Sequence, residues 1–593
     1  MVWMAMAFAA LAALFTVISL VAGCRADPTY EASLEPPRCD VASDCPASGQ
    51  VCSLDGHCFF PADPGMNLAV ELVPQSTDKD SSDTPLTRME FAPDDLQYLQ
   101  DGSVRLTYDA PVEVSGDVSV VEYAFDGTGF DVFETQVSIW RSSRIPGRPK
   151  VLYSKTLSLD MTARSPGDQI SGSFLFHVPA DQGYTLRASP QGYFAQVYPP
   201  MVVRDVTINE DHSQSFLFDL EGQYLRAYGR VVDAMGMGVS GIQARLEDPE
   251  GVYSSTLSAP TEEDGEFVVA LPLGKRDYTL ELMPVGDATA LPEIQFHLQE
   301  VGSETLNTNV ELSDANGQDF TYPALLSPCE YVYTVMGISS AGTREPVSGA
   351  VVSFSTQVGG GSDNDGHVNN QGTTDENGRV RVHLIPGMNR NTRLYEVTVV
   401  PPMDSNYASK FMEIEVSRCG GTGADLELTP RTEVVGRVQT QDGVQVSNVT
   451  LQARPSNSSE NEGTPSSLMT SLGIRPTETT GENGKFFLKL DPGFYDLELV
   501  PPTSSYLPRW LVSNVEIHDG LSKTINVEIP NASLFLGRIV SNDGEPVTGF
   551  DVKVYMVAEE CLDSETCETP AFYLGEGSTQ EDGRFQVLIP RPE

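Results

Sequence analysis

The nine cysteines are the residues of this sequence with the most definite chemistry. Four of them follow one another with the spacing C-x5-C-x6-C-x5-C: Cys39, Cys45, Cys52 and Cys58. Zinc sites favour C-x2–4-C pairs, and only His57 adds a nitrogen ligand nearby, so this spacing fits a metal site poorly. In an exported chain four such cysteines oxidise. The spacing therefore predicts two disulfides, whose connectivity the sequence leaves open, with a metal site as the weaker alternative.

Four further cysteines form two pairs in the later part of the chain. Cys329 and Cys419 lie before the first strand and after a late strand predicted for one repeated unit, so a sandwich fold could bring them together. Cys561 and Cys567 lie in one loop beside acidic residues such as Asp563, whereas an activated thiolate needs positive surroundings. We expect both pairs to be disulfides, and a redox-active Cys561–Cys567 pair is the weaker alternative.

The ninth cysteine ends an apolar run at the start of the chain. Residues 1–24 carry no charged side chain, and a run of this length fits either a transmembrane helix or a signal peptide. The run ends in Val21-Ala22-Gly23-Cys24, which resembles the bacterial lipobox, although the basic residues usual before such a run are missing. The resemblance implies a signal peptide over residues 1–23 and a lipid on Cys24 that binds the membrane. Arg25 follows where Asp would favour the inner membrane, so we expect a cell-envelope protein anchored in the outer membrane, facing the surface or the periplasm.

The charge and the length of the chain limit its partners and its organisation. The chain has 83 Asp and Glu against 37 Lys and Arg, a net charge of −46. Nucleic-acid binding needs clustered positive charge, so we do not expect a nucleic-acid partner. A length of 593 residues predicts about four domains.

A repeated sequence unit fills most of the chain. The motif Thr-x-Glu-[Asp/Asn]-Gly-x-[Phe/Val] begins at four threonines: Thr261, Thr374, Thr480 and Thr579. Asp-Gly and Asn-Gly supply the left-handed backbone of a tight turn, and the alternating residues after the glycine predict a short strand. A proline follows each turn glycine by 7 or 8 residues and ends that strand. The motif therefore predicts a hairpin corner in each unit.

Each unit also has a characteristic start and end. The opening glycines are 108, 99 and 101 residues apart: Gly229, Gly337, Gly436 and Gly537. Three units close with a strand of alternating apolar and polar residues, which starts at Tyr278, Tyr395 or Tyr495. A fainter copy lies upstream, with Gly116, Gly172 and Tyr184 in the same order. Alternation with period two gives one buried and one wet face, and seven short strands per roughly 100 residues are typical of a β-sandwich.

The opening from Gly537 to Val547 and the Thr-x-Glu-Asp-Gly-x-Phe corner resemble the carboxypeptidase regulatory-like domain, a transthyretin-like sandwich of seven strands. The resemblance covers residues 221–593 well and 65–220 weakly. It implies non-catalytic modules that attach to enzymes, receptors and surface proteins. We therefore expect an all-β chain of tandem Ig-like or transthyretin-like seven-stranded β-sandwiches. The expected segments are a signal peptide (1–23), a short cysteine-rich stalk (24–64), a divergent sandwich (65–220) and four repeated units (221–325, 326–430, 431–530 and 531–593).

The last repeated unit is expected to be incomplete. Its corner strand ends at Pro590, and three residues follow, so the closing strand is missing. In the preceding unit 38 residues separate Pro492 from the boundary at Pro530. Either the chain continues in the full gene, or a partner supplies the strand to an open sheet edge.

The motifs of common enzymes give no positive evidence of catalysis. The one H-x-x-E sequence, His297-Leu298-Gln299-Glu300, lies in an alternating strand, where a chance match explains it better than zinc catalysis. No G-x-S-x-G motif of a serine hydrolase is present. We expect no catalytic residue, no enzyme activity and no cofactor other than calcium. Asp363 and Asp365 are a candidate weak calcium site because oxygen side chains alternate there, although a solvated loop is the stronger interpretation.

Exposed aromatic residues are the remaining candidates for ligand binding. Sugars stack on flat aromatic faces, and Tyr506 and Trp510 lie close together near the end of a predicted sandwich. Core or inter-domain packing is the more frequent role of such a tryptophan. Our leading hypothesis is a surface lipoprotein with a lipid anchor, a disulfide-braced stalk and a structural, adhesive rod of sandwiches that binds a surface glycan or protein. A carbohydrate-binding module array and a non-catalytic subunit of an exported hydrolase are the alternatives.

Overall fold

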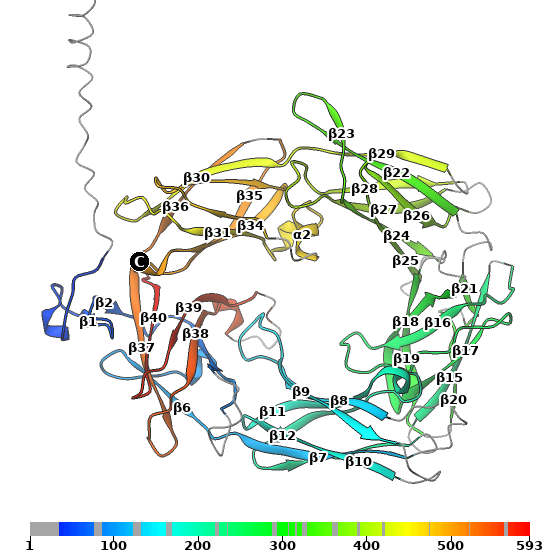
Figure 1. Cartoon of the computed structure of the whole chain (residues 1–593), viewed down its shortest axis with the longest axis horizontal. Helices are drawn as coiled ribbons and strands as arrows, with labels where there is room; N and C mark the ends of the chain where they lie inside the picture. The colour runs from blue at the N-terminus through cyan, green and yellow to red at the C-terminus, as the bar shows by residue number, and fades with distance from the viewer. Residues whose placement is uncertain are drawn as a thin grey trace, which may run out of the picture.

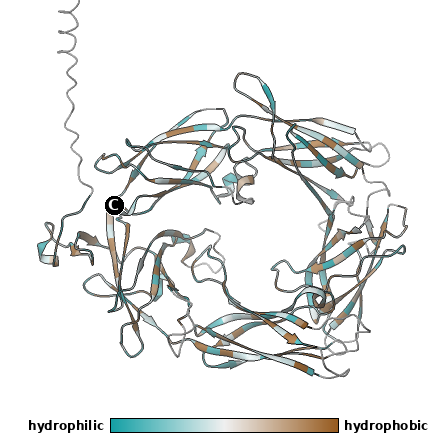
Figure 2. Cartoon of the chain, viewed as in Figure 1, coloured by the Kyte–Doolittle hydropathy of each residue, from teal (hydrophilic) through white to brown (hydrophobic). Residues whose placement is uncertain are grey.

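The computed structural model is nearly all β, which confirms the predicted fold class. It describes residues 35–592 apart from 76–85, 122–131, 162–168, 220–223, 234, 287–292, 306–307, 315–316, 323–328, 359–365, 388–391, 418–420, 472, 474, 521, 563–566 and 568. Hydrophobic and hydrophilic residues alternate along many strands (Figure 2), so that a sheet has one face in a core and the other in water. None of the helices in these residues is long and apolar enough to cross a membrane.

We number the sandwiches in chain order, so that the divergent one is unit one and the four repeated units are units two to five. Unit four shows the sandwich most clearly. Its strands are β30 (Thr432–Thr440), β31 (Thr450–Pro455), β32 (Thr477–Thr479), β33 (Lys485–Leu490), β34 (Gly493–Val500), β35 (Trp510–Ile517) and β36 (Lys523–Ile529), with the short helices η5 (Ser459–Asn461), α2 (Ser467–Ser471) and η6 (Thr503–Ser505). One sheet has the order β33-β30-β36, in which β30 and β36 are parallel. The other has the order β32-β31-β34-β35 and is antiparallel. These are the seven strands in two sheets that the sequence predicts.

Units one, two and three are built on the same plan. Unit one has β7 (Val112–Val121), β8 (Val132–Arg141), β9 (Val151–Asp160), β10 (Gln169–Val178), β11 (Asp181–Pro190), η3 (Gly192–Gln196), β12 (Met201–Ile208), β13 (His212–Ser213) and β14 (Phe216–Phe218). Unit two has β15 (Tyr224–Asp233), β16 (Ile242–Glu247), β17 (Glu266–Pro272), β18 (Gly274–Pro284), β19 (Glu293–Ser303), β20 (Asn309–Glu311) and β21 (Phe320–Tyr322). Unit three has β22 (Cys329–Ile338), β23 (Arg344–Pro346), β24 (Val351–Val358), β25 (Gly366–Thr373), β26 (Arg379–Leu384), β27 (Arg393–Val400), β28 (Lys410–Val416) and β29 (Gly421–Leu428). Each unit encloses a cluster of buried apolar side chains between its sheets.

Unit five is built from both ends of the chain. Its C-terminal part has β37 (Ala532–Ser541), β38 (Phe550–Met556), η7 (Glu559–Cys561), β39 (Phe572–Ser578) and β40 (Arg584–Pro590). The residues that we call the N-terminal arm (66–108) add β3 (Leu68–Pro74), β4 (Met89–Phe91), η2 (Pro93–Asp95), β5 (Gln97–Tyr98) and β6 (Val104–Tyr108). The cysteine-rich segment before the arm has η1 (Ala42–Asp44), β1 (Val51–Cys52) and β2 (Cys58–Pro61).

The opening glycine and the corner phenylalanine of a unit pack against each other. In unit four a side-chain carbon on Gly436 would lie 1.8 Å from the carbonyl oxygen of Ile525 and 2.5 Å from the ring of Phe486. A glycine also lies against a phenylalanine ring in three other units: Gly116–Phe174, Gly229–Phe267 and Gly537–Phe585. The two motifs that recur separately in the sequence are therefore the two sides of one close contact. The upstream copy in unit one has this contact too.

Replacing Gly436 with alanine is expected to destabilise unit four by about 1–3 kcal/mol, because the added methyl group overlaps the Ile525 carbonyl and displaces β36. Gly481→Ala in the same unit is the matched control. The nearest atom to its methyl group would be 4.0 Å away, so a change within about 0.5 kcal/mol is expected. Thermal unfolding followed by the fluorescence of Trp510 on β35 measures both variants. Equal melting temperatures for the two variants would contradict the assigned contact.

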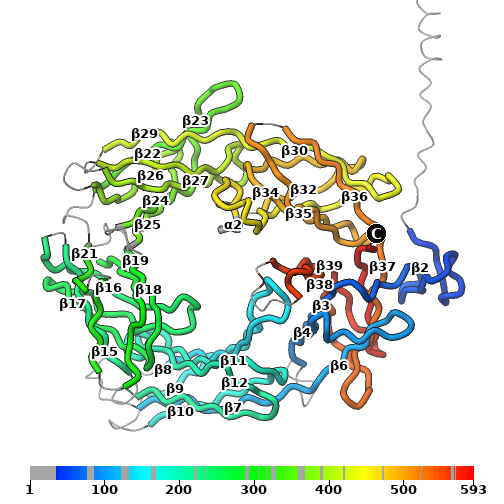
Figure 3. Tube along the Cα trace, turned by 180° about the vertical axis from the view of Figure 1, so that it is seen from behind, coloured from blue at the N-terminus to red at the C-terminus, as the bar shows by residue number. Residues whose placement is uncertain are grey.

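The five units follow one another around a closed ring (Figures 1 and 3). Units two and three share one continuous sheet, because β19 pairs with β25. The other neighbours meet through side chains: Arg204–Glu250 between units one and two, the Asp491 carboxylate with the Ser409 N–H between four and three, Arg509–Tyr573 between four and five, and Arg141–Glu90 between five and one. The ring differs from the rod that the sequence led us to expect. The difference arises because the N-terminal arm belongs to the last unit.

Candidate functional site: the closure of the ring

The N-terminal arm takes the place of the three strands that the C-terminal part of unit five lacks. The sheet β39-β38-β3-β4 repeats the order of β32-β31-β34-β35 in unit four. In the second sheet β6 runs parallel to β37, as β36 runs parallel to β30. Val104 of β6 lies opposite the opening glycine Gly537, as Ile525 lies opposite Gly436. Unit five is therefore a complete sandwich whose last three strands come from the start of the chain.

This closure corrects the expected boundary of the first sandwich at 65–220. The structure divides that range between units five and one, and side chains such as Leu72 and Phe535 share one core. The strand expected to be missing from unit five is supplied by the same chain. A sequence signal for it exists, since Val70 to Pro74 reads V-E-L-V-P and the closing strand of unit four reads L-E-L-V-P from Leu497 to Pro501. The signal lies at the other end of the chain from the unit it completes.

A buried carboxylate, Glu71 on β3, joins the arm to units five and one. Its side chain is 2% exposed, and its oxygens lie 2.6 Å from Nε of Arg88 and 3.1 Å from Nη2 of Arg148. The hydroxyl of Tyr555 on β38 donates a hydrogen bond to the same carboxylate at 2.7 Å. Burial and the neighbouring carboxylate raise the pKa of Tyr555, so it stays a proton donor. Glu71 thus contacts three separate segments of the chain.

A second buried carboxylate, Glu90 on β4, binds the loop that follows β8 in unit one. Its oxygens accept hydrogen bonds from the Ser143 hydroxyl at 2.8 Å and from the Arg144 N–H at 2.9 Å. They also lie 3.1 Å from Arg88 and 3.3 Å from Arg141. Because a buried charge left without its partner is costly, these contacts fix the position of unit one against the arm.

An apolar contact covers the same junction. Ile145, in the loop after β8, is fully buried among side chains of the arm and of unit five. The carbonyl of the next residue, Pro146, accepts the N–H of Ala571 at 2.9 Å. The structure pairs Cys561 with Cys567, and Cys561 belongs to the same buried cluster. This disulfide closes the loop of unit five against which unit one packs.

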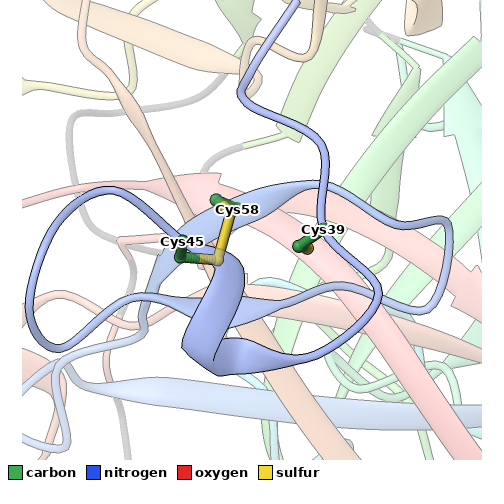
Figure 4. Close-up of side chains that lie close together, drawn as sticks. All are labelled: Cys39, Cys45 and Cys58. Carbon is green, nitrogen blue, oxygen red and sulfur yellow. A yellow bond between two sulfur atoms is a disulfide. The ribbon is translucent and has the colours of Figure 1, made fainter.

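The cysteine-rich segment packs on unit five. Its two disulfides are Cys39–Cys52 and Cys45–Cys58, of which Figure 4 shows the second beside Cys39. Three of these sulfur atoms lie within 4.8 Å of one another, as two adjacent disulfides require, and disulfide sulfurs are not the thiolates that bind a metal. β2 pairs in parallel with β37, and the Leu54 N–H donates to the side chain of Gln586 at 2.7 Å. The described part of the expected stalk therefore packs on unit five.

The two aromatic residues proposed for sugar binding lie at this junction and pack within the protein. The ring centre of Tyr506 is 4.6 Å from that of His57 and 6.4 Å from that of Phe59, both in the cysteine-rich segment. Trp510 is half-buried and packs against the core of unit four. The Tyr506 contacts hold the cysteine-rich segment on unit four, and the contacts of both residues favour a packing role.

The other sequence-predicted residues are placed only in part. Four of them lie outside the described residues, so lipidation and calcium binding stay predictions: Cys24, Asp363, Asp365 and Cys419. Cys329 is disulfide-bonded. In the parallel pair of β22 and β29, Tyr331 lies opposite Gly421, each two positions after one of the cysteines predicted to pair. The bond between Cys329 and Cys419 stays a prediction.

No family model and no curated protein matches the sequence. Solved structures do show similarity to it. The TIE protein of Bacillus anthracis is 12% identical, with 67% of this chain and 69% of that chain covered and a TM-score of 0.15. GBS52, the minor pilin of Streptococcus agalactiae, is 11% identical, with 34% and 95% covered and a TM-score of 0.20. A streptococcal ancillary pilin is 13% identical, with 54% and 99% covered and a TM-score of 0.17. TM-scores this low carry no conclusion about function, which has to rest on the geometry of this chain.

Proposed function

We propose that this chain is a structural and adhesive protein of the cell surface, a ring of β-sandwich modules. The composite unit five is the observation that carries the proposal. Both ends of the chain close the ring there, and the buried carboxylates Glu71 and Glu90 hold the closure. A closed ring keeps the outer faces of five modules at fixed mutual positions, which suits attachment at several points at once. The proposal gives the chain no catalytic role.

The cysteine-rich segment supports an anchor beside the closure. Residues 35–61 are the described residues nearest in sequence to Cys24, and they pack on unit five through β2 and Leu54. A lipid on Cys24 would therefore hold the ring to a membrane close to unit five. We infer residence in the outer membrane, with the lipid as the membrane contact.

Replacing Cys24 with serine is expected to release the protein from the membrane fraction and to abolish the adhesion of cells that express it. Serine lacks the thiol to which the lipid is attached, and an unanchored ring cannot link a cell to a surface. Metabolic labelling with radioactive palmitate measures the loss of the lipid, membrane fractionation the loss of membrane binding, and a cell-attachment assay the loss of adhesion. Labelled wild-type protein in membranes and unlabelled variant outside them are the expected results.

The control for this experiment is Cys561→Ser, which removes a different cysteine and keeps residue 24. It should take up palmitate and stay in the membrane fraction like the wild type. A palmitate label on the Cys24 variant would contradict the anchor. Equal attachment of cells with and without the wild-type protein would contradict the adhesive role.

A further inference from the structure

The outer face of the sheet β33-β30-β36 in unit four carries two cations that face each other. Arg437 on β30 lies directly opposite Lys485 on β33, and both side chains are exposed. Like charges directly opposite in a sheet destabilise it. Neither cation forms an ion pair with any residue that the structure describes, although the chain has 83 acidic residues against 37 basic ones. This pair of free cations needs an explanation.

The equivalent positions of unit two are neutralised. In unit two Arg230 lies opposite Glu266 and pairs with Asp319 at 3.1 Å. In unit five two arginines, Arg538 and Arg584, lie opposite each other as in unit four, but Arg584 pairs with Asp582, the acid of the corner motif. The fold itself therefore does not require uncompensated cations at these positions.

The corner motif of unit four lacks the aspartate that is present in units two and five. It reads Glu482-Asn483-Gly484 where unit five reads Glu581-Asp582-Gly583. Asparagine preserves the tight turn, since it tolerates the same backbone as aspartate, but it carries no charge. The corner turn of unit four therefore offers Lys485 no aspartate like the one that pairs with Arg584 in unit five.

Apolar and hydrogen-bonding side chains adjoin the two cations. Phe487 and Val435 lie opposite each other one step along the same strands, and they are 43% and 39% exposed. On β36, Thr524 lies opposite Val435 and Asn526 lies opposite Arg437. These side chains, together with Glu478, line a shallow hollow of about 630 Å³. The hollow thus combines two positive charges and one carboxylate with an exposed aromatic ring and amide and hydroxyl groups.

We propose that this face of unit four binds an acidic glycan through the carboxylates of its uronic-acid residues. The planar guanidinium of Arg437 can hold a carboxylate with two parallel hydrogen bonds, and Lys485 adds a second charge. Phe487 offers a ring against which the C–H face of a sugar packs, and Nζ of Lys489 lies 5.9 Å from that ring. Asn526 can both donate to and accept from sugar hydroxyls. This ligand class deepens the adhesive role proposed above and rests on it.

The position of the hollow favours a sugar over an acidic peptide. β30 is paired on both sides, so a peptide can add as a further strand only along the outer edge of β33 or β36, beside the hollow and not over it. A ligand on this face has to lie across the side chains. A flat, polyhydroxylated, carboxylated ligand uses the ring, the amide and the guanidinium together.

Calorimetry of the purified full chain with oligogalacturonate as the probe tests the proposal. The methyl ester of the same oligomer keeps the sugar and removes the charge, and polyglutamate keeps the charge and removes the sugar. Oligogalacturonate is expected to bind at least tenfold more tightly than either, with an affinity that falls as salt is added. No binding by the wild type, equal binding of the ester, or tighter binding of polyglutamate would overturn the proposal.

Matched variants locate the site. Arg437→Gln is expected to weaken binding about tenfold or more, and Phe487→Ala about fivefold, with unchanged melting temperatures because both side chains are exposed. Arg230→Gln and Val268→Ala change the equivalent positions of unit two and should leave the affinity as in the wild type. An equal loss in the unit-two variants would overturn the assignment to unit four. If oligogalacturonate does not bind, the cell-attachment result still tests the adhesive role separately, because calorimetry of the purified chain needs neither the lipid anchor nor cells.

Discussion

Replacing Glu71 with alanine is expected to destabilise the closure of the ring by about 3 kcal/mol or more. The carboxylate is almost completely buried, and Arg88 and Arg148 both lie against it. Its removal leaves two guanidinium groups without their shared partner, and the Tyr555 hydroxyl loses its acceptor. The cost of uncompensated buried polar groups exceeds the value of the contacts themselves. The effect should be confined to unit five and to the contact of unit five with unit one.

Hydrogen exchange read by mass spectrometry measures this local opening directly. Peptides from β3 and β38 in the Glu71 variant should exchange about 100-fold faster than in the wild type, because each 1.4 kcal/mol is a factor of ten. Peptides from β30 and β33 should keep their rates. The control is Glu330→Ala, which removes an exposed ion pair with Arg381 and should change stability by less than about 0.5 kcal/mol. Unchanged protection of β3 in the Glu71 variant would mean that the cluster does not hold the closure.

The fold of a single unit could be predicted because its signals are local. The Asn-Gly or Asp-Gly corner and the period-two alternation each act within one hairpin. The contact of Gly436 with Phe486 explains why the two motifs recur together. The ring depends on pairing between strands at opposite ends of the chain, such as β3 with β38, and on the angles between neighbouring units. The V-E-L-V-P match identifies β3 as a closing strand, but no local pattern shows which unit it completes or sets the angles between units.

The role of Glu71 could not be predicted from its own sequence context. In the V-E-L-V-P strand, alternation places the glutamate on the wet face. The equivalent glutamates in units two and four, Glu281 and Glu498, are each 23% exposed and pair with an arginine of their own unit. Glu71 is buried because the loop after β8 of unit one covers it. Its environment is therefore set by a neighbouring unit.

Replacing Asp491 with alanine is expected to destabilise the junction of units three and four by about 3–5 kcal/mol. Asp491 and Arg431 are 0% and 1% exposed, with Nε of the arginine 2.8 Å from one carboxylate oxygen. The other oxygen accepts the N–H of Ser409 at 3.0 Å. Without the carboxylate a charged guanidinium remains where water cannot reach it. The double variant Arg431→Met/Asp491→Leu removes both charges and keeps the volume, so it should regain most of the loss.

The closed ring makes the outcome at this junction different from that of an open chain of modules. Hydrogen exchange of the segment around Ser409 should accelerate in Asp491→Ala, while β3 and β38 stay protected because the closure is far away and shares no side chain with it. The radius of gyration from small-angle scattering should stay at the wild-type value, since units three and four remain joined through the rest of the ring. If the double variant is as unstable as Asp491→Ala, the loss of stability comes from lost contacts and not from the unpaired charge of Arg431. A larger radius of gyration in Asp491→Ala, with β3 still protected from exchange, would show that the ring opens at the junction of units three and four. Closure at unit five would then not be enough to keep the modules in place.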